Sequence, residues 1–231
     1  MRGEFFHILN RGIEDKKIFL KKENYLRFVN NMDDFNNKEN ATLPYFFRRK
    51  QFKLTKITSQ TSLSKLGKKL VDIFCWTLIP NHYHIFVQEK IDGGASEFTR
   101  KIGIGYTMHF NEEEKRSGVL FKGRSKIIPV KEDAHFIHLP FYILANPLDL
   151  FQPGWREKGI TNPKKAFKFL ENYQWSAFQD LLGKSNFPEV INKKLLYELF
   201  DTNERKFKKD FIEWLNSCAN SPDLENFDEY K

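Results

Sequence analysis

The sequence is poor in cysteine and lacks long hydrophobic runs. Its 231 residues hold two cysteines, Cys75 and Cys218, which lie far apart, so a disulfide framework is not expected. No run reaches the roughly 18 apolar residues of a membrane-spanning helix, and residues 1–4 lead into a strand-like segment rather than a secretory leader. Internal repeats, a Walker motif and zinc-spaced Cys/His clusters are lacking too. These absences predict a cytoplasmic protein without a membrane partner.

Positive charge and aromatic residues are both abundant. Lys and Arg number 38 against 30 Asp and Glu, a net charge of +8, and the chain holds 24 Phe. Cationic side chains neutralise phosphates and aromatic rings stack on bases, so this composition suits a nucleic-acid partner. Two plainer interpretations stay open, because many basic proteins bind nothing specific and most Phe side chains fill cores. The length suffices for one proper core with appendages.

The most informative stretch is residues 74–87, where two β-rich apolar runs flank Pro80-Asn81. This pattern predicts a strand, a tight turn and a second strand. Side chains alternate along a strand, so His82 and His84 share one face. Two neutral imidazoles so placed can bind one divalent first-row cation. With this spacing alone, two polar residues near a strand end are the more common case, so the metal interpretation needs further support.

Other elements follow from the spacing of apolar residues. A strand is expected over residues 4–12, where His7 is more typical of a half-buried position than of a ligand. Helices are expected over residues 22–32 and 97–113. In the second helix Tyr106 falls on the apolar stripe and is expected in the core, whereas Gly103 and Gly105 either permit close packing or weaken the helix.

Two segments are strongly basic and contain no acidic residue, residues 48–70 and 115–126. Such segments suit contact with a nucleic-acid backbone, although a solvated basic loop has the same composition. The second segment leads into a short strand in which Pro129 indicates a sheet edge or a bulge. The expected DNA-binding residues, including one at the end of the first strand, are Arg11, Arg48, Arg49, Lys50, Lys115, Arg116, Lys122, Arg124 and Lys126.

A helix is expected after Glu132, with Pro140 inside it to kink or restart it. Tyr142 and Asn146 are four residues apart and therefore share one face of this helix. A phenol and an amide side by side can serve as a nucleophile and a metal ligand. Equally, Tyr142 can be a core residue and Asn146 a cap before the following proline.

Six motifs in order make the chain, from His7 to about Gly183, resemble the single-tyrosine HUH transposases, particularly the REP-associated tyrosine transposases. These motifs are Asn10-Arg11-Gly12, Leu78-Ile79-Pro80-Asn81-His82-Tyr83-His84, Gly105-Tyr106-Thr107, Gly118-Val119-Leu120-Phe121-Lys122-Gly123-Arg124, Tyr142-Ile143 with Asn146-Pro147, and Tyr173-Gln174-Trp175-Ser176. Many relatives carry a histidine two residues after the tyrosine, where this chain has Leu144.

The resemblance implies an α+β fold, a ferredoxin-like or RRM-like antiparallel sheet with helices on one face, and the histidine pair on a central strand. It implies that His82, His84 and Asn146 hold Mg²⁺ or Mn²⁺ and that Tyr142 is the nucleophile. The implied activity is cleavage and rejoining of single-stranded or hairpin DNA through a 5′-phosphotyrosyl intermediate. A homodimer is possible, since some relatives share active sites across two copies.

Residues 1–183 are expected to form the catalytic domain, with a basic insertion at about residues 38–70. Residues 184–231 are expected to add a helical extension, with an amphipathic helix over 203–214 and an acidic tail. The alternative to catalysis is an RRM-like module that binds DNA or RNA hairpins without cutting. Replication initiators and relaxases share the hairpin, but their tyrosine generally lies in a different order relative to the histidines.

Overall fold

The structure is a computed structural model that describes residues 3–38, 68–131 and 133–220. Its first part consists of β1 (Phe5–Arg11), the 3₁₀ turn η1 (Ile13–Asp15), α1 (Lys22–Asp34), β2 (Val71–Ile79), β3 (His82–Glu89), α3 (Gly94–Glu113) and β4 (Lys126–Pro129). Its second part is helical, with α4 (Asp133–Ala145), α5 (Leu148–Phe151), α6 (Trp155–Lys158), α7 (Pro163–Asn172), α8 (Phe178–Leu181), α9 (Lys193–Leu199) and α10 (Glu204–Asn220).

The four strands form one antiparallel sheet in the order β2-β3-β1-β4. Together with α1 and α3 they give the β-α-β-β-α-β succession of the ferredoxin-like fold. The α+β, ferredoxin-like expectation is therefore confirmed. β3, which carries both histidines, lies between β2 and β1 in the interior of the sheet.

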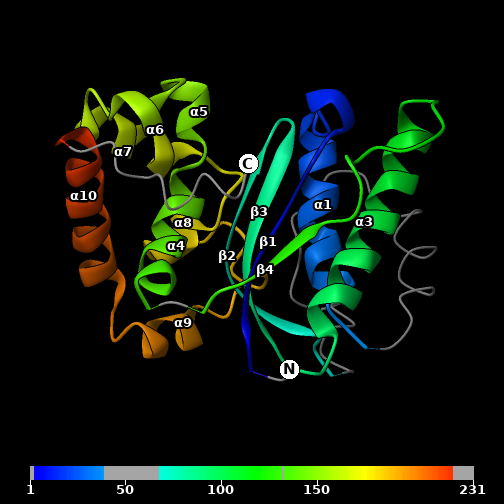
Figure 1. Ribbon diagram of the computed structural model, residues 1–231, viewed down its shortest axis with the longest axis horizontal. Helices are drawn as coiled ribbons and strands as arrows, with labels where there is room; N and C mark the ends of the chain where they lie inside the picture. The colour runs from blue at the N-terminus through cyan, green and yellow to red at the C-terminus, as the bar shows by residue number, and fades with distance from the viewer. Residues whose placement is uncertain (1–2, 39–67, 132, 221–231) are drawn as a thin grey trace.

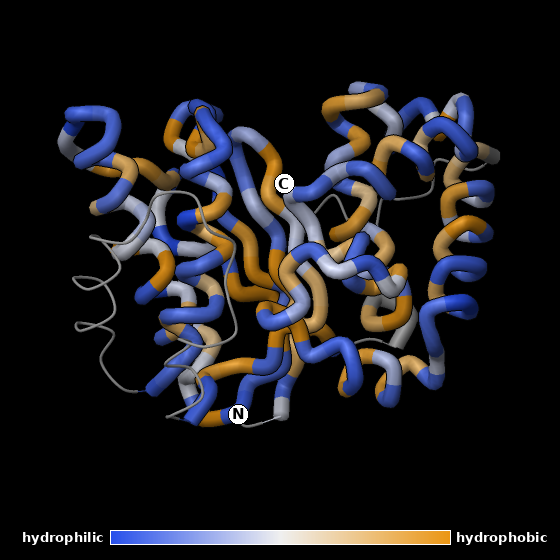
Figure 2. The backbone as a smooth tube through the Cα atoms, turned by 180° about the vertical axis from the view of Figure 1, so that it is seen from behind, coloured by the Kyte–Doolittle hydropathy of each residue, from blue (hydrophilic) through white to orange (hydrophobic). Residues whose placement is uncertain are grey.

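Helices cover both faces of the sheet (Figure 1). α1 and α3 lie on one face, where Phe28 packs on Tyr83 with ring centroids 4.7 Å apart. α4 lies on the other face, where Phe136 packs on Phe86 at 5.7 Å. The expected layer of helices on one face consists of α1 and α3. The helices that follow β4 cover the other face and form a third layer. The reason is that β2 is buried along its whole length and hydrophobic residues make up much of the central strands (Figure 2), so both faces need a cover.

The outer edge of β2 is closed by the segment around residues 175–177. The Leu78 N–H donates to the Trp175 carbonyl at 2.9 Å, and the Ala177 N–H donates to the Trp76 carbonyl at 3.0 Å. Trp175 is 9% exposed and stacks on Tyr25 with ring centroids 4.6 Å apart, so its indole belongs to the core. Pairing of this kind satisfies backbone groups that an open edge would leave exposed.

The helical second part packs on the same core as the sheet. In α10 the Phe211 ring lies 4.5 Å from that of Phe178 and 5.5 Å from that of Phe141 in α4. The amphipathic helix expected over 203–214 is therefore present and extends to Asn220. None of the described helices is both long enough and apolar enough to span a membrane.

α3 begins at Gly94, one turn earlier than the expected Glu97, because two neighbours stabilise its start. Gly93 takes a left-handed conformation with φ of 73°, and the Ala95 N–H donates to a Glu89 carboxylate oxygen at 3.0 Å. Further along, Tyr106 is fully buried, as expected, and its hydroxyl donates to the Ile18 carbonyl.

The two glycines of α3 differ in their surroundings. A Cβ on Gly105 would lie 2.3 Å from Cε2 of Phe35, whereas a Cβ on Gly103 would meet nothing within 4 Å. Gly105 therefore permits the close approach of Phe35, and Gly103 only lowers the helix propensity.

Gly105→Ala should lower the free energy of unfolding by about 1–3 kcal/mol, because the packed Phe35 ring must move. The matched change Gly103→Ala should raise it by about 0.5–1 kcal/mol through helix propensity alone. Urea unfolding followed by circular dichroism measures both. Equal effects from the two substitutions would contradict this packing of Phe35.

Candidate active site

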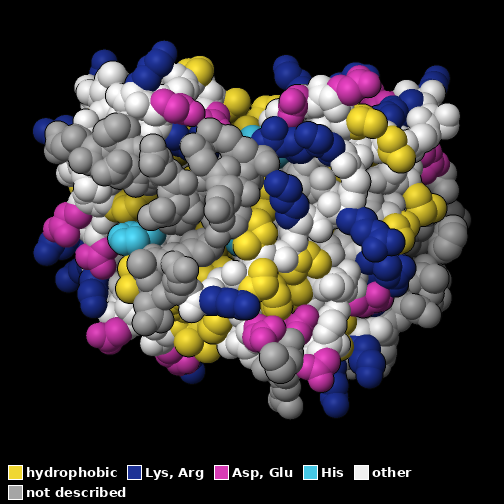
Figure 3. Space-filling model, in the orientation of Figure 1, with side chains coloured by type: hydrophobic (Ala, Val, Ile, Leu, Met, Phe, Trp, Pro, Cys, Tyr) yellow, Lys and Arg dark blue, Asp and Glu magenta, His cyan; other side chains and the backbone are white. Residues whose placement is uncertain are grey.

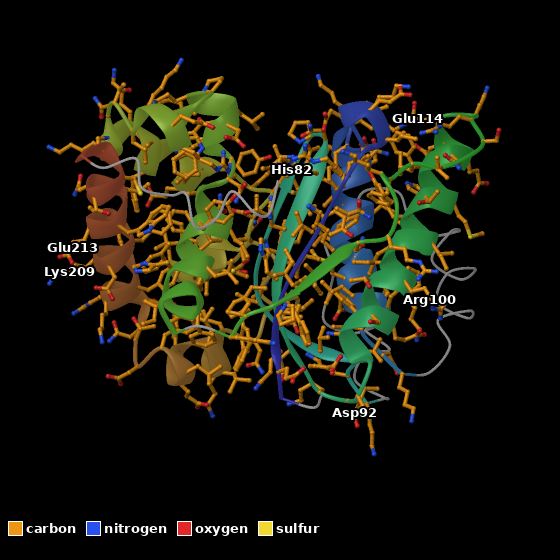
Figure 4. All side chains as sticks on the ribbon, in the orientation of Figure 1. His82, Asp92, Arg100, Glu114, Lys209 and Glu213 are labelled. Carbon is orange, nitrogen blue, oxygen red and sulfur yellow. The ribbon has the colours of Figure 1, made fainter. Side chains whose placement is uncertain are left out.

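His82 lies at the end of the sheet where β3 begins, between α1 and the helices of the second part (Figure 4). Its cross-strand partner is Arg11, the last residue of β1. His84 follows on the same face and is 3% exposed. The two imidazole centroids are 5.2 Å apart, with the rings nearly perpendicular.

The hydrogen bond of His82 fixes which ring nitrogen can bind a ligand. Its Nδ1 lies 2.7 Å from Oδ1 of Asn81. Because an amide oxygen only accepts, Nδ1 carries the proton and Nε2 keeps a lone pair. An outer-shell partner of this kind is the usual way in which a metal-binding histidine is oriented.

A third histidine belongs to the cluster. Nε2 of His7 lies 2.9 Å from Nδ1 of His84, and the two rings are stacked with centroids 5.1 Å apart. When His84 donates this bond from Nδ1, its Nε2 is left with a lone pair, like that of His82. The expectation that His7 is merely a half-buried strand residue is therefore wrong, since it is completely buried and holds His84.

α4 places Tyr142 over this cluster, and Asn146 follows directly after the last residue of the helix. The Tyr142 ring centroid lies 6.5 Å from that of His7 and 6.2 Å from that of His84, edge-on in both cases. Nδ2 of Asn146 donates to the Tyr142 carbonyl at 2.8 Å. Tyr142 is 2% exposed and Asn146 1%. His82, His84 and Tyr142 therefore lie together on one face of the sheet, and Asn146 is joined to Tyr142 by this bond.

Arg156 of α6 is a member of the site that the sequence did not indicate. Its Nη2 donates to Oδ1 of Asn146 at 2.7 Å, and its guanidinium carbon lies 5.4 Å from the Tyr142 ring centroid. Its Nη1 forms an ion pair with Asp149, which also accepts a bond from Trp155 Nε1 at 3.0 Å. Burial opposes the charge of Arg156, but Tyr142 and Asp149 outweigh it and raise the pKa of the guanidinium.

Both imidazoles are neutral near pH 7. Burial lowers the pKa of His82 to about 4, and the charge of Arg11 adds to this effect. Burial and then the neighbouring His7 hold the pKa of His84 well below its usual range. Neutral imidazole is the form that binds a metal ion.

The donor set fits a divalent cation when the amide is included. Within the described ranges, no group of three His, Cys, Asp or Glu residues could hold a metal ion. Two imidazole nitrogens and the Asn146 oxygen, which retains a second lone pair beside its bond to Arg156, remain available. Such a mixed nitrogen and oxygen set suits a first-row divalent ion and leaves positions for phosphate or water.

Part of the expected DNA-binding set lies at the same end of the sheet. The Lys122 N–H donates to the Arg11 carbonyl at 2.8 Å, so the basic loop before β4 is fastened to the end of β1. Lys and Arg side chains lie beside a histidine at the top of the molecule (Figure 3). Lys115, Arg116, Lys122, Arg124 and Lys126 are all exposed. Arg48, Arg49 and Lys50 lie outside the described residues.

Comparison with protein-family models gives no match, and neither does comparison with curated proteins. A search of solved structures gives a REP-associated tyrosine transposase bound to a REP hairpin, with a TM-score of 0.48 and 13% sequence identity. The alignment covers 82% of this chain and 85% of that chain. The matched protein comes from the family that the sequence motifs resemble. At this identity the likeness concerns the fold alone.

The lowered pKa of His82 predicts a loss of stability in mild acid. The unfolded chain gains a proton near pH 6.5 and the folded one near pH 4, so this stabilisation is complete above pH 6.5 and is lost as the pH falls between these values. By pH 5 the loss should reach at most about 2 kcal/mol. Urea unfolding at pH 7 and pH 5 should show that His82→Gln loses less free energy of unfolding between these pH values than the unmodified protein does. An equal loss of stability in both proteins would contradict a neutral, partly buried His82.

Proposed function

We propose that the protein is a metal-dependent strand transferase that cleaves and rejoins single-stranded DNA through Tyr142. One observation carries the proposal: the Tyr142 phenol is held beside the His7–His84 pair, and the Arg156 guanidinium lies against its ring. A tyrosine beside a guanidinium and beside His84, which with His82 would bind a metal ion, has the parts needed for attack on a phosphodiester.

In the proposed step the Tyr142 oxygen attacks phosphorus, forming a phosphotyrosyl bond while the bond from phosphorus to the 3′ oxygen breaks. The phenol proton is lost and the departing 3′ oxygen gains one, so a 5′-phosphotyrosyl end and a free 3′-hydroxyl result. A free phenol has a pKa of about 10, so it needs help near neutral pH. Arg156 offsets negative charge that develops on the phenol oxygen.

The reverse step needs no external energy source, because the phosphotyrosyl ester retains the phosphodiester bond energy. Another 3′-hydroxyl brought to the site attacks the ester, releases Tyr142 and joins two strands. The protein would therefore transfer strands rather than only cut them.

His82, His84 and Asn146 would hold the metal, Mg²⁺ or Mn²⁺. Bound there, the ion would act as a Lewis acid on the phosphate oxygens. Imidazole ligands favour Mn²⁺ over Mg²⁺, which prefers oxygen. The His7–His84 bond contributes by holding His84 in one tautomer and orientation.

Substrate approach is proposed along the basic rim of the site. Arg11 and Lys122 lie at the end of β1, next to the strand that carries His82. Cationic side chains here would position the phosphates of the strand. Hairpin-bearing ends are the substrate that the family resemblance implies, and we extend that proposal to this chain.

The RRM-like alternative requires an open sheet face on which bases stack. Here α4 buries one face, including Phe86, and α1 and α3 bury the other, including Tyr83. The structure therefore disfavours recognition of RNA on the open sheet. The other alternative, a protein that binds hairpins without cutting them, differs from a strand transferase because it forms no covalent adduct with DNA.

Tyr142→Phe should abolish the SDS-resistant protein–DNA adduct formed with hairpin-bearing single strands and Mn²⁺, because the attacking oxygen is removed. DNA affinity should stay within about twofold, since the ring packing is kept. The matched variant Tyr197→Phe, in α9, removes a hydroxyl that donates to the Leu181 carbonyl of α8 and should retain the adduct. Gel electrophoresis of labelled DNA measures both. A persisting adduct in Tyr142→Phe would refute the role of this tyrosine.

Mn²⁺ should stabilise the protein in the absence of DNA. At 100 times the dissociation constant the gain is about 2.7 kcal/mol, and a chelator should reverse it. His82→Gln and His84→Gln should each lose the gain, whereas His138→Gln, at an exposed histidine of α4, should keep it. Thermal unfolding followed by circular dichroism reports the difference. Stabilisation by Mn²⁺ that persists in His84→Gln would show that the ion binds at another site.

A further inference from the structure

A pair of stacked phenylalanines lies on the surface next to the candidate site. Phe151 ends α5 and Phe169 lies in α7, with ring centroids 5.2 Å apart and planes inclined by 25°. Phe151 is 39% exposed, and Phe169 is half-buried. An exposed aromatic surface of this kind is a candidate for ligand contact.

α7 sets cationic side chains beside these rings. Lys165 and Phe169 are four residues apart, as are Lys168 and Asn172, so all four share one side of the helix. The buried side of the helix, with Ala166 and Leu170, fixes this orientation. Within the part of the chain that the structure describes, no carboxylate forms an ion pair with either lysine.

The rings and lysines border a shallow hollow of about 400 Å³. It is lined by Phe151, Lys165, Lys168, Phe169, Asn172 and Tyr173. Its floor is aromatic and its charged groups are all cations. This combination complements a flat base attached to a negatively charged phosphate.

The hollow adjoins the site on two sides. Phe151 follows Asp149 by two residues, so their Cα atoms are at most about 7 Å apart, and Asp149 holds Arg156. On the other side, the Tyr173 hydroxyl donates to the Leu78 carbonyl at 2.7 Å, just before the turn that leads to His82. A strand whose scissile phosphate lies at Tyr142 would therefore pass close to these rings.

We propose that Phe151 and Phe169 form a stacking platform for an unpaired base of the DNA strand that flanks the scissile phosphate. Lys165 and Lys168 contact the phosphates of the same nucleotides. The inference rests on the proposed function and adds a subsite to it. Base stacking of this kind tolerates any sequence, because every base has a flat face, so the platform holds the strand without selecting its sequence.

The test compares binding of fluorescein-labelled oligo(dT) with binding of an abasic strand of equal length, by anisotropy, in EDTA so that no cleavage occurs. Phe151→Ala and Phe169→Ala should weaken oligo(dT) binding by about 5- to 150-fold and leave the abasic strand unaffected. Phe151→Trp should retain binding. Leu150→Ala, at the adjacent residue, which is 47% exposed, is the matched control and should change neither affinity.

The lysines should show a different signature. Lys165→Gln and Lys168→Gln should weaken binding of both strands, since both carry phosphates, and each should lower the slope of log affinity against log salt by about 0.7. Phe151→Leu keeps an apolar side chain against α7 without a flat ring. It should fold normally and lose affinity for oligo(dT) as Phe151→Ala does, which separates stacking from packing.

The possible outcomes distinguish the proposed stacking platform from the proposed strand transfer through Tyr142. Oligo(dT) affinity that is unchanged in Phe151→Ala and Phe169→Ala, with the Tyr142 adduct intact, overturns the platform and leaves strand transfer standing. Dependence on Phe151 without any adduct supports the platform and overturns strand transfer. Absence of oligo(dT) binding by the unmodified protein overturns the platform, and so does tighter binding of oligo(rU), which would assign the hollow to RNA.

Discussion

The antiparallel register between β1 and β3 is the constraint on which the site depends. It sets Arg11 opposite His82 and Leu9 opposite His84, and so leaves His7 diagonal to His84 and within hydrogen-bonding distance. Because side chains alternate along a strand, a slip of one residue would turn this histidine cluster away from α4 and toward α1. The apolar faces on both sides of the sheet oppose such a slip, so ordinary core packing maintains the geometry of the polar cluster.

Arg156 ties three successive elements to one another. A guanidinium this deeply placed is tolerable only with partners, and it finds them in Asn146 at the end of α4, Asp149 in α5 and the ring of Tyr142. Removing one partner would leave a buried charge short of a contact, which generally costs more than the pair contributes. α4 and the two short helices after it are therefore held as a unit, and the Tyr142 phenol is positioned from outside its own helix.

Much of the fold and part of the site could be predicted from the sequence. The features that could be predicted are set by local spacing, whereas those that could not depend on contacts between distant residues. The hairpin, the edge position of β4 and the shared face of Tyr142 and Asn146 are local, because alternation and helical spacing determine them. The roles of His7 and Arg156 depend on contacts with residues 77 and 10 positions away, respectively, which no local pattern encodes. The same holds for the start of α3, where Glu89 of the preceding strand supplies the cap.

The cover over β2 also restricts how two copies of the chain could meet. Residues 175–177 occupy that edge, so within the described part of the chain β4 is the edge left for continuation of the sheet into a second copy. β4 has four residues, and Pro129 among them has no N–H to contribute to a ladder. Two copies that paired through β4 would therefore share only a few backbone hydrogen bonds, too few for a stable dimer. Among the described residues, helices and side chains therefore offer more for self-association than the edge of the sheet does.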